Sequence, residues 1–185
     1  MKKVGFQSFL LAAIFILTGC ATHLTKPSAS PKPATVRLSE FKSVEMKSVG
    51  ISERFSANGA NQKALRKIDE LLFQDMRMIF PELKRIEAGQ EFSAAAERTL
   101  QIVPTIKEIK FIGGAARFWA GAMAGSSAVL MQATYKDSST GDVIADPEFY
   151  RSAGAYAGAW SIGNTDNRML EDIAKDIVNY SSYNR

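Results

Sequence analysis

The strongest constraint on the fold is a change in character near residue 36, which limits the foldable part to about 150 residues. Residues 4–17 carry no charge and follow Lys2 and Lys3, and residues 21–35 hold three of the six prolines. The first run is too short to span a bilayer comfortably, but it suits the apolar region of a signal peptide. Proline at such density disfavours helix and interior strand. The second stretch is therefore expected to be an extended, solvated tether, and residues 36–185 a single domain.

The junction of these two stretches reads Leu17-Thr18-Gly19-Cys20. It resembles the lipobox of bacterial lipoproteins: an aliphatic residue, two small residues and the cysteine that receives diacylglycerol. The resemblance implies that residues 1–19 are cleaved and that Cys20 is acylated, beginning a lipidated, proline-rich tether over residues 20–35. Several acyl chains together give a lasting membrane anchor. The alternative is an ordinary signal peptide with a chance cysteine, or a free buried thiol.

The residue after the cysteine is Ala21. In Gram-negative lipoproteins an Asp at this position typically signals retention in the inner membrane. By resemblance, Ala21 favours the outer membrane, with the domain facing the periplasm.

Cysteine and histidine are too scarce for several classes of site. Cys20 and His23 are the only residues of their types. Disulfides within the chain, zinc fingers, Cys/His pairs and Ser/His/Asp triads are therefore excluded. Loss of Lys2 and Lys3 with the leader leaves 21 basic against 19 acidic residues, which gives no case for a nucleic-acid partner. We expect no enzyme activity, cofactor or metal.

Periodicity predicts strands over 41–52, 98–111 and 126–137, and the last of these returns through a turn at 138–141 into a partner strand over 142–152. Leu83 to Ile86 predicts a further short strand. Pro104 favours an edge position or a bulge for the strand that holds it.

Two helices are expected among these strands. Asn58 offers an N-cap to a helix whose apolar residues step by three or four until Pro81 ends it. A closing helix begins near Asn164 or Thr165 and carries a second apolar stripe. The expected class is α+β: a single-domain sandwich of a mostly antiparallel sheet with two main amphipathic helices.

Two acidic groups could hold a metal ion or do acid–base chemistry. Asp137, Asp142 and Asp146 surround the hairpin turn, but their spacing lacks the ladder of an EF-hand loop, so turn-forming aspartates are the better interpretation. Glu171, Asp172 and Asp176 on the closing helix are read as a solvated face.

The unusual feature is a pair of Gly/Ala-rich stretches, at 113–127 and 153–163. Small residues allow close backbone approach, as between membrane helices. These stretches are either wide loops that pack together or segments that contact a membrane or a second subunit. Phe118, Trp119, Met123 and Trp160 within them are the candidates for partner contact.

The motif Asp137-Ser138-Ser139-Thr140-Gly141, together with the lipobox, tether and Gly-rich stretches, resembles a family of bacterial lipoproteins whose domain has no known function. More remotely, the layout is similar to periplasmic domains of curli-secretion and transport-auxiliary lipoproteins. The resemblance implies an outer-membrane lipoprotein that acts as a periplasmic interaction or accessory module in an envelope complex for transport, secretion or surface assembly. The alternative is a subunit of an oligomeric membrane pore or channel.

Overall fold

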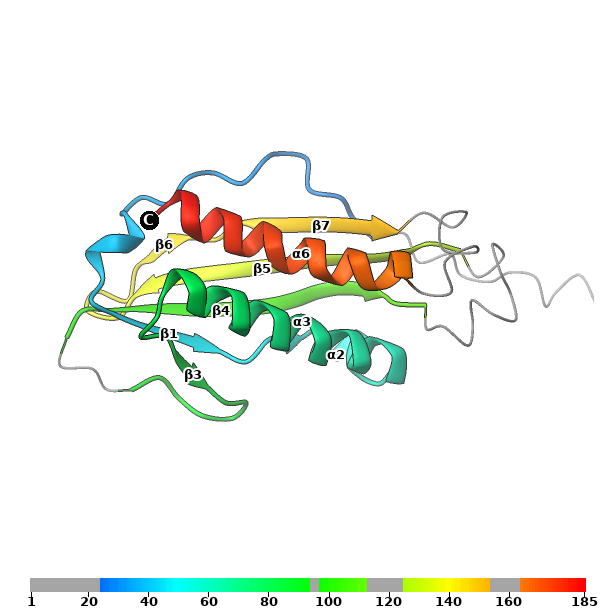
Figure 1. The fold of residues 1–185 in the computed structure, drawn as a ribbon, viewed down its shortest axis with the longest axis horizontal. Coiled ribbons are helices and arrows are strands. Elements are labelled where there is room, and N and C mark those ends of the chain that lie inside the picture. The colour runs from blue at the N-terminus through cyan, green and yellow to red at the C-terminus, as the bar shows by residue number, and fades with distance from the viewer. Residues whose placement is uncertain (1–23, 94–96, 113–124, 154–163) are drawn as a thin grey trace, which may run out of the picture.

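The computed structural model describes residues 24–93, 97–112, 125–153 and 164–185. Figure 1 shows one mixed sheet with two long helices packed on it. In chain order the elements are the 3-10 helix η2 (Leu38–Glu40), β1 (Ser43–Lys47), β2 (Gly50–Ile51), α2 (Glu53–Ser56), α3 (Gly59–Ile79), β3 (Lys84–Ile86), β4 (Thr99–Lys110), β5 (Ser127–Asp137), β6 (Val143–Ala145), β7 (Glu148–Ala153) and α6 (Asn164–Tyr183).

The sheet has two parts that meet at β4. On one side β1 and β2 pair with β4 in parallel, and β3 pairs in parallel with β1. On the other side β5 pairs antiparallel with β4, and β6 and β7 both pair antiparallel with the far edge of β5. The two longest pairings, β4 with β5 and β5 with β7, are antiparallel. The predicted α+β class, with a single domain and two main helices, is confirmed.

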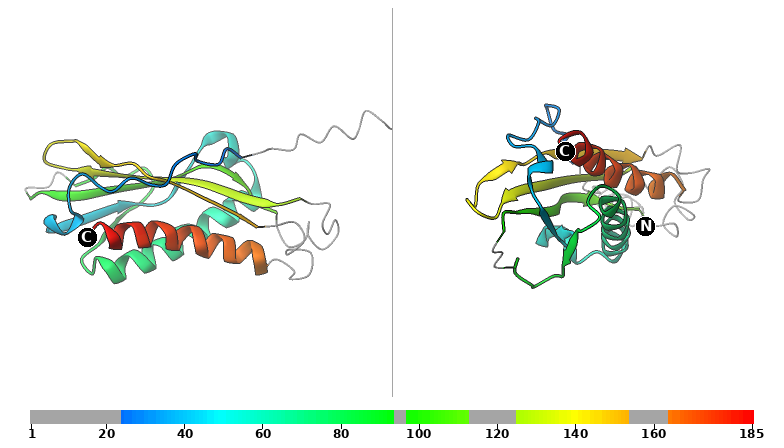
Figure 2. Two further views of the ribbon diagram at one scale, coloured as in Figure 1. Left: turned by 90° about the horizontal axis from the view of Figure 1, so that it is seen from above. Right: turned by 60° about the vertical axis from the view of Figure 1, so that its left-hand side comes forward.

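Both long helices lie on the same face of the sheet (Figure 2). The core fills the space between them and the sheet. Its fully buried side chains come from β1, β4, β5 and both long helices, and they include Met46, Ile68, Leu72, Met76, Leu100, Ile102, Ile106, Met131, Tyr135, Leu170, Ile173 and Ile177. The predicted apolar stripes on both helices therefore face the core, although Leu65, Ile79 and Val178 are only partly buried.

The start of α3 is fixed by two asparagines. The side chain of Asn58 accepts hydrogen bonds from the backbone N–H groups of Ala60 and Asn61, as predicted for an N-cap. Asn61 is buried, and its side chain donates to the carbonyl of Phe55 and accepts from the N–H of Phe111. These bonds hold the first turn of α3 beside the end of β4.

Pro104 does not lie on an edge strand, because β4 is paired on both sides. Opposite Pro104, Ala133 donates its N–H to the carbonyl of Pro147, away from β4. The nitrogen of Pro104 therefore faces the other side, where β1 has ended at Lys47 and β2 has not begun. The central strand tolerates the proline because its neighbour is interrupted at the same level. The bulge of β4 lies further on, between Ile106 and Glu108.

Candidate interaction surface: a docked strap and the groove beside it

Residues 24–36, here called the strap, run along the β7 edge of the sheet (Figure 1) and also border Gln132 on the sheet face away from the helices. Hydrogen bonds fix the strap at four levels. Near its start the N–H of Thr25 donates to Oε2 of Glu108 at 3.1 Å. Further along, the hydroxyl of Tyr180 donates to the carbonyl of Lys32 at 2.8 Å, and the N–H of Ala34 donates to Oδ1 of Asn184 at 2.8 Å.

At the fourth level both the N–H and the hydroxyl of Thr35 donate to the carbonyl of Ile144, at 2.9 and 3.1 Å. Pro27, Pro31 and Pro33 keep the strap extended, and an extended proline-rich segment makes no internal hydrogen bonds. Its backbone groups are therefore available to the domain. The sequence predicted an extended, solvated segment; most strap residues are exposed, but the described part of the tether lies along the domain instead of projecting from it.

A groove of about 620 Å³ separates part of the strap from β7 and α6. We call it the strap groove. Strap residues 26–31 form one wall, and the other is formed by Glu148, Phe149, Tyr150, Arg151, Asp176, Asn179, Tyr180 and Tyr183. The volume falls within the range of ordinary ligand or side-chain binding sites.

The two tyrosines of α6 in this groove have different roles. Tyr180 is buried, and its ring meets the edge of Phe149 at 5.8 Å and lies tilted 5.6 Å from Tyr135. Burial raises the pKa of Tyr180, so its phenol keeps the proton that it donates to Lys32. Tyr183 is 86% exposed, although it is a large side chain with an apolar ring. Tyr180 therefore fixes the groove, and Tyr183 remains available for contact.

A bidentate ion pair lies along the groove wall. Nε and one terminal nitrogen of Arg151 donate to the two carboxylate oxygens of Asp176, at 2.6 and 2.5 Å. These hydrogen bonds raise the pKa of Arg151. Asp176 was predicted to be a solvated residue of the closing helix; it instead joins α6 to β7. Asp172 on the same helix is exposed, as predicted.

A second recess, of about 580 Å³, lies on the other side of the strap, against β5 and β6. Its polar wall contains Asp146, whose carboxylate accepts from Nε2 of Gln132 at 2.6 Å and from the hydroxyl of Thr134 at 2.7 Å. Both donors stand on β5, on the sheet face away from the helices. The carboxylate thus joins β5 to the segment between β6 and β7.

The three aspartates around the hairpin do not form a cation site. The carboxylate of Asp137 is buried and accepts from Nε of Arg98 at 2.7 Å and from the N–H and hydroxyl of Ser139. Burial alone raises the pKa of Asp137, but the bonds from Ser139 and Arg98 outweigh it and lower the pKa. Within the residues that the structure describes, no group of three or more His, Cys, Asp or Glu side chains could hold a metal ion. The interpretation as turn-forming aspartates holds for Asp137.

The buried phenol of Tyr135 also has a structural role. Its oxygen lies 2.7 Å from the hydroxyl of Ser181, which itself donates to the carbonyl of Ile177. Burial raises the pKa of Tyr135, so the phenol stays protonated at neutral pH. The pair joins β5 to the last turn of α6.

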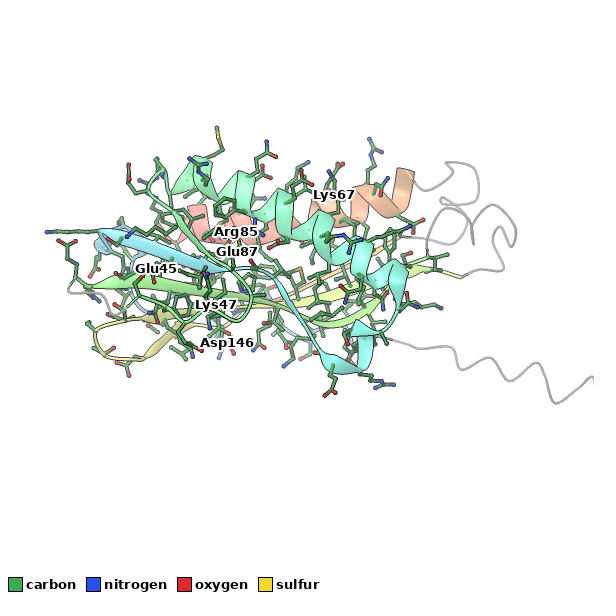
Figure 3. All side chains as sticks on the ribbon, turned by 90° about the horizontal axis from the view of Figure 1, so that it is seen from below. Glu45, Lys47, Lys67, Arg85, Glu87 and Asp146 are labelled. Atoms are coloured by element: carbon green, nitrogen blue, oxygen red, sulfur yellow. The ribbon has the colours of Figure 1, made fainter. Side chains whose placement is uncertain are left out.

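At the opposite edge of the sheet, charged side chains join α3 to β3 (Figure 3). Arg85 pairs with Asp69 of α3 and, at 3.1 Å, with Glu87. The carboxylate of Asp69 also accepts the N–H of Val49, where β1 breaks. Glu45 on β1 is only 2% exposed and accepts the N–H of Ser93 at 3.2 Å. These contacts join the segment after β3 to the sheet.

The residues that the sequence favoured for function lie outside the described part of the chain. They are the lipobox Leu17, Thr18, Gly19 and Cys20, and the partner-contact candidates Phe118, Trp119, Met123 and Trp160. Lipidation and aromatic partner contact at these positions stay predictions. Sequence reasoning missed Arg151, Tyr180 and Tyr183. The spacing of the two tyrosines on one helix was visible, but nothing in the sequence placed the strap beside them.

No helix of the described residues is both long and apolar enough to cross a bilayer.

No protein-family model matches the chain, and no curated protein matches it. Several solved structures have a similar fold. The PelC dodecamer from Paraburkholderia phytofirmans is 12% identical at a TM-score of 0.45, covering 83% of this chain and 94% of that one. A Xanthomonas campestris protein of the family DUF330 is 6% identical at a TM-score of 0.45, covering 84% of this chain and 95% of that one.

A minor lipoprotein from Acinetobacter baumannii is 11% identical at a TM-score of 0.35, covering 76% of this chain and 94% of that one. Structures with a similar fold thus include a lipoprotein, a DUF330 protein and a PelC dodecamer. With TM-scores below 0.5, these likenesses do not show what this chain does.

Proposed function

We propose that this chain is a non-enzymatic outer-membrane lipoprotein, anchored through Cys20, whose domain acts in the periplasm as an interaction module of an envelope complex. The observation that carries the proposal is the strap groove. It lies beside the segment that follows the predicted anchor, and it presents exposed Tyr183 and half-buried Tyr150.

The chemistry of the groove favours a protein partner. Tyrosine offers a large contact area at a small cost in side-chain entropy and is enriched at protein interfaces. Within the described residues β7 pairs on one side only, with β5, so its other edge adds backbone groups that an extended segment of a partner could use. Acid–base chemistry has less support here, because the carboxylate of Asp176 is held by Arg151.

The anchor is tested by the intact mass of the protein purified from membranes, compared with that of a Cys20→Ala variant. We expect acyl chains on the first and none on the second. A wild-type protein without acyl chains contradicts the anchor and leaves a periplasmic module without lipid.

The groove is tested by the proteins that co-purify in mild detergent. Tyr183→Ser combined with Tyr150→Ser should remove at least one partner that the wild-type protein retains. Met78→Ser is the matched control, because Met78 is 82% exposed but lies on α3, away from the groove. Equal recovery of every partner from all three proteins would contradict the role of the groove. A large closed homo-oligomer of defined mass, with no other protein, would instead favour the pore alternative.

A further inference from the structure

We infer that the docked strap orients the domain on the bilayer, with the end where β4 finishes and β5 begins held against the lipid headgroups. The inference rests on the proposed lipid anchor at Cys20, and it adds the surface of the domain that meets the membrane.

The strap starts at the end of the sheet where β4 finishes. The N–H of Thr25 is bonded to Glu108, which lies two residues before β4 ends at Lys110. Lys110 pairs with Ala128 at the beginning of β5. The first turn of α3 is at the same end, because Asn61 binds the N–H of Phe111. We call this region, with α2 and the first turns of α3, the strap-start end.

The segment between Cys20 and the strap is short. Leu24 is four positions along the chain from Cys20, and a fully extended chain spans at most about 14 Å over that length. From Glu108 back to Thr99, at the opposite end of β4, nine residues of strand cover about 30 Å. An acyl chain on Cys20 therefore holds the strap-start end near the bilayer, and the opposite end lies further away.

The hydrogen bonds of the strap to the domain shorten the part of the tether that is free to move. If the strap were free as far as Thr35, the fifteen residues after Cys20 could extend about 45 Å, and either end of the domain could approach the lipid. The contacts of Lys32, Ala34 and Thr35 with α6 and β6 remove that freedom. The strap thus shortens the anchor to its first few residues.

Charge at the strap-start end is consistent with a headgroup surface. Arg54, Lys63 and Lys107 are exposed there and Lys110 is half-buried, against Glu53 and Glu108. A net positive surface within a Debye length of anionic lipid is attracted to it.

The test uses the full, lipidated chain in vesicles of phosphatidylethanolamine and phosphatidylglycerol that contain a nickel-chelating lipid. Spin labels are placed at Ala57→Cys and at Glu82→Cys, two exposed positions that lie beyond opposite ends of α3, a helix about 31 Å long. The acylated Cys20 does not react with the label. We expect relaxation by the membrane-bound nickel to be severalfold stronger at position 57. Equal relaxation, or stronger relaxation at position 82, overturns the inference.

A release variant separates the strap from the anchor. Glu108→Ala with Tyr180→Phe removes two of the docking contacts and should reduce the difference between the labels. Glu70→Ala, the same change at an exposed position in the middle of α3 and away from the strap, should leave the difference unchanged. Circular dichroism melting confirms that each variant is folded. The intact mass reports the anchor separately: missing acyl chains contradict the proposed function, and equal relaxation in an acylated protein contradicts only the orientation.

Discussion

The two faces of the sheet are covered in different ways. On one face α3 and α6 pack over apolar side chains such as Ile106 and Met131, which are fully buried. On the other face, side chains such as Gln132 keep partial exposure, and the strap that borders this face is held only by single hydrogen bonds to its neighbours. Burial of a large apolar side chain stabilises a fold by about 1.5–3 kcal/mol, whereas a single hydrogen bond contributes about 1 kcal/mol. The helix-covered face therefore carries the stability of the fold, and the strap-covered face can open without unfolding it.

The sharpest test of this division removes a core side chain from the helix-covered face. Ile173→Ala on α6 leaves a cavity at a position with no exposed surface. We expect the free energy of unfolding to fall by about 2–5 kcal/mol, measured by urea denaturation. Val143→Ala, at a position 52% exposed on β6, is the control and should change it by less than about 0.5 kcal/mol. Equal losses at the two positions would contradict the division.

A smaller effect is expected where a charge is buried at the end of the sheet. Asp137→Asn removes charge-assisted bonds from Arg98 and Ser139, at a cost of about 1–3 kcal/mol at neutral pH. Because the folded protein lowers the pKa of Asp137, its contribution is complete above the unfolded pKa of about 3.9 and is lost as the pH falls through the folded pKa. Denaturation at several acidic pH values should therefore show a flatter pH dependence for the variant. If the free energy of unfolding changes with pH equally in the two proteins, Asp137 is excluded as a source of acid sensitivity.

The N-cap of α3 tests how much the helix-covered face depends on local structure. Asn58→Ala leaves the N–H groups of Ala60 and Asn61 without their acceptor. The expected loss is about 1 kcal/mol, seen as a lower thermal midpoint. Asn58→Asp retains an acceptor and should keep most of the stability; a loss equal to that of the alanine variant would show that the cap contributes nothing.

The smallest effect belongs to the strap-covered face. Tyr180→Phe keeps the ring against Phe149 but removes the donor to Lys32. Hydrogen exchange at the amides of Ala34 and Thr35 should quicken by up to about tenfold, the equivalent of 1.4 kcal/mol. Exchange at the amides of β5 should not change. Faster exchange in both places would mean that the strap and the core open together.

The sequence allowed prediction wherever a local pattern decides the structure. The cap at Asn58, the apolar stripe through Ile68 and Leu72, and the turn at Gly141, whose φ is +77°, each follow from neighbouring residues. In the second half of β5, from Met131 on, burial likewise alternates between the two differently covered faces.

Features that depend on distant residues could not be predicted. Pro104 indicated an edge strand or a bulge, but the interruption between β1 and β2 lets it occupy the central strand, and only the pairing shows this. The proline-rich composition predicted that residues 24–35 are extended, but not that Tyr180 and Asn184 hold them. A polyproline conformation exposes its backbone groups equally to water and to protein, so composition cannot distinguish the two.

The strap also has a place in the order of folding. Its contacts at Lys32 and Ala34 join residues 148 and 150 positions apart, and that at Thr35 spans 109 positions. Contacts between residues so far apart must first offset the entropy of closing a long loop, and single hydrogen bonds cannot do so alone. The strap therefore docks after the sheet and α6 have formed their core. Until that moment residues 24–35 are free of the domain, so this segment is accessible while the chain is still unfolded and becomes part of a surface only in the finished protein.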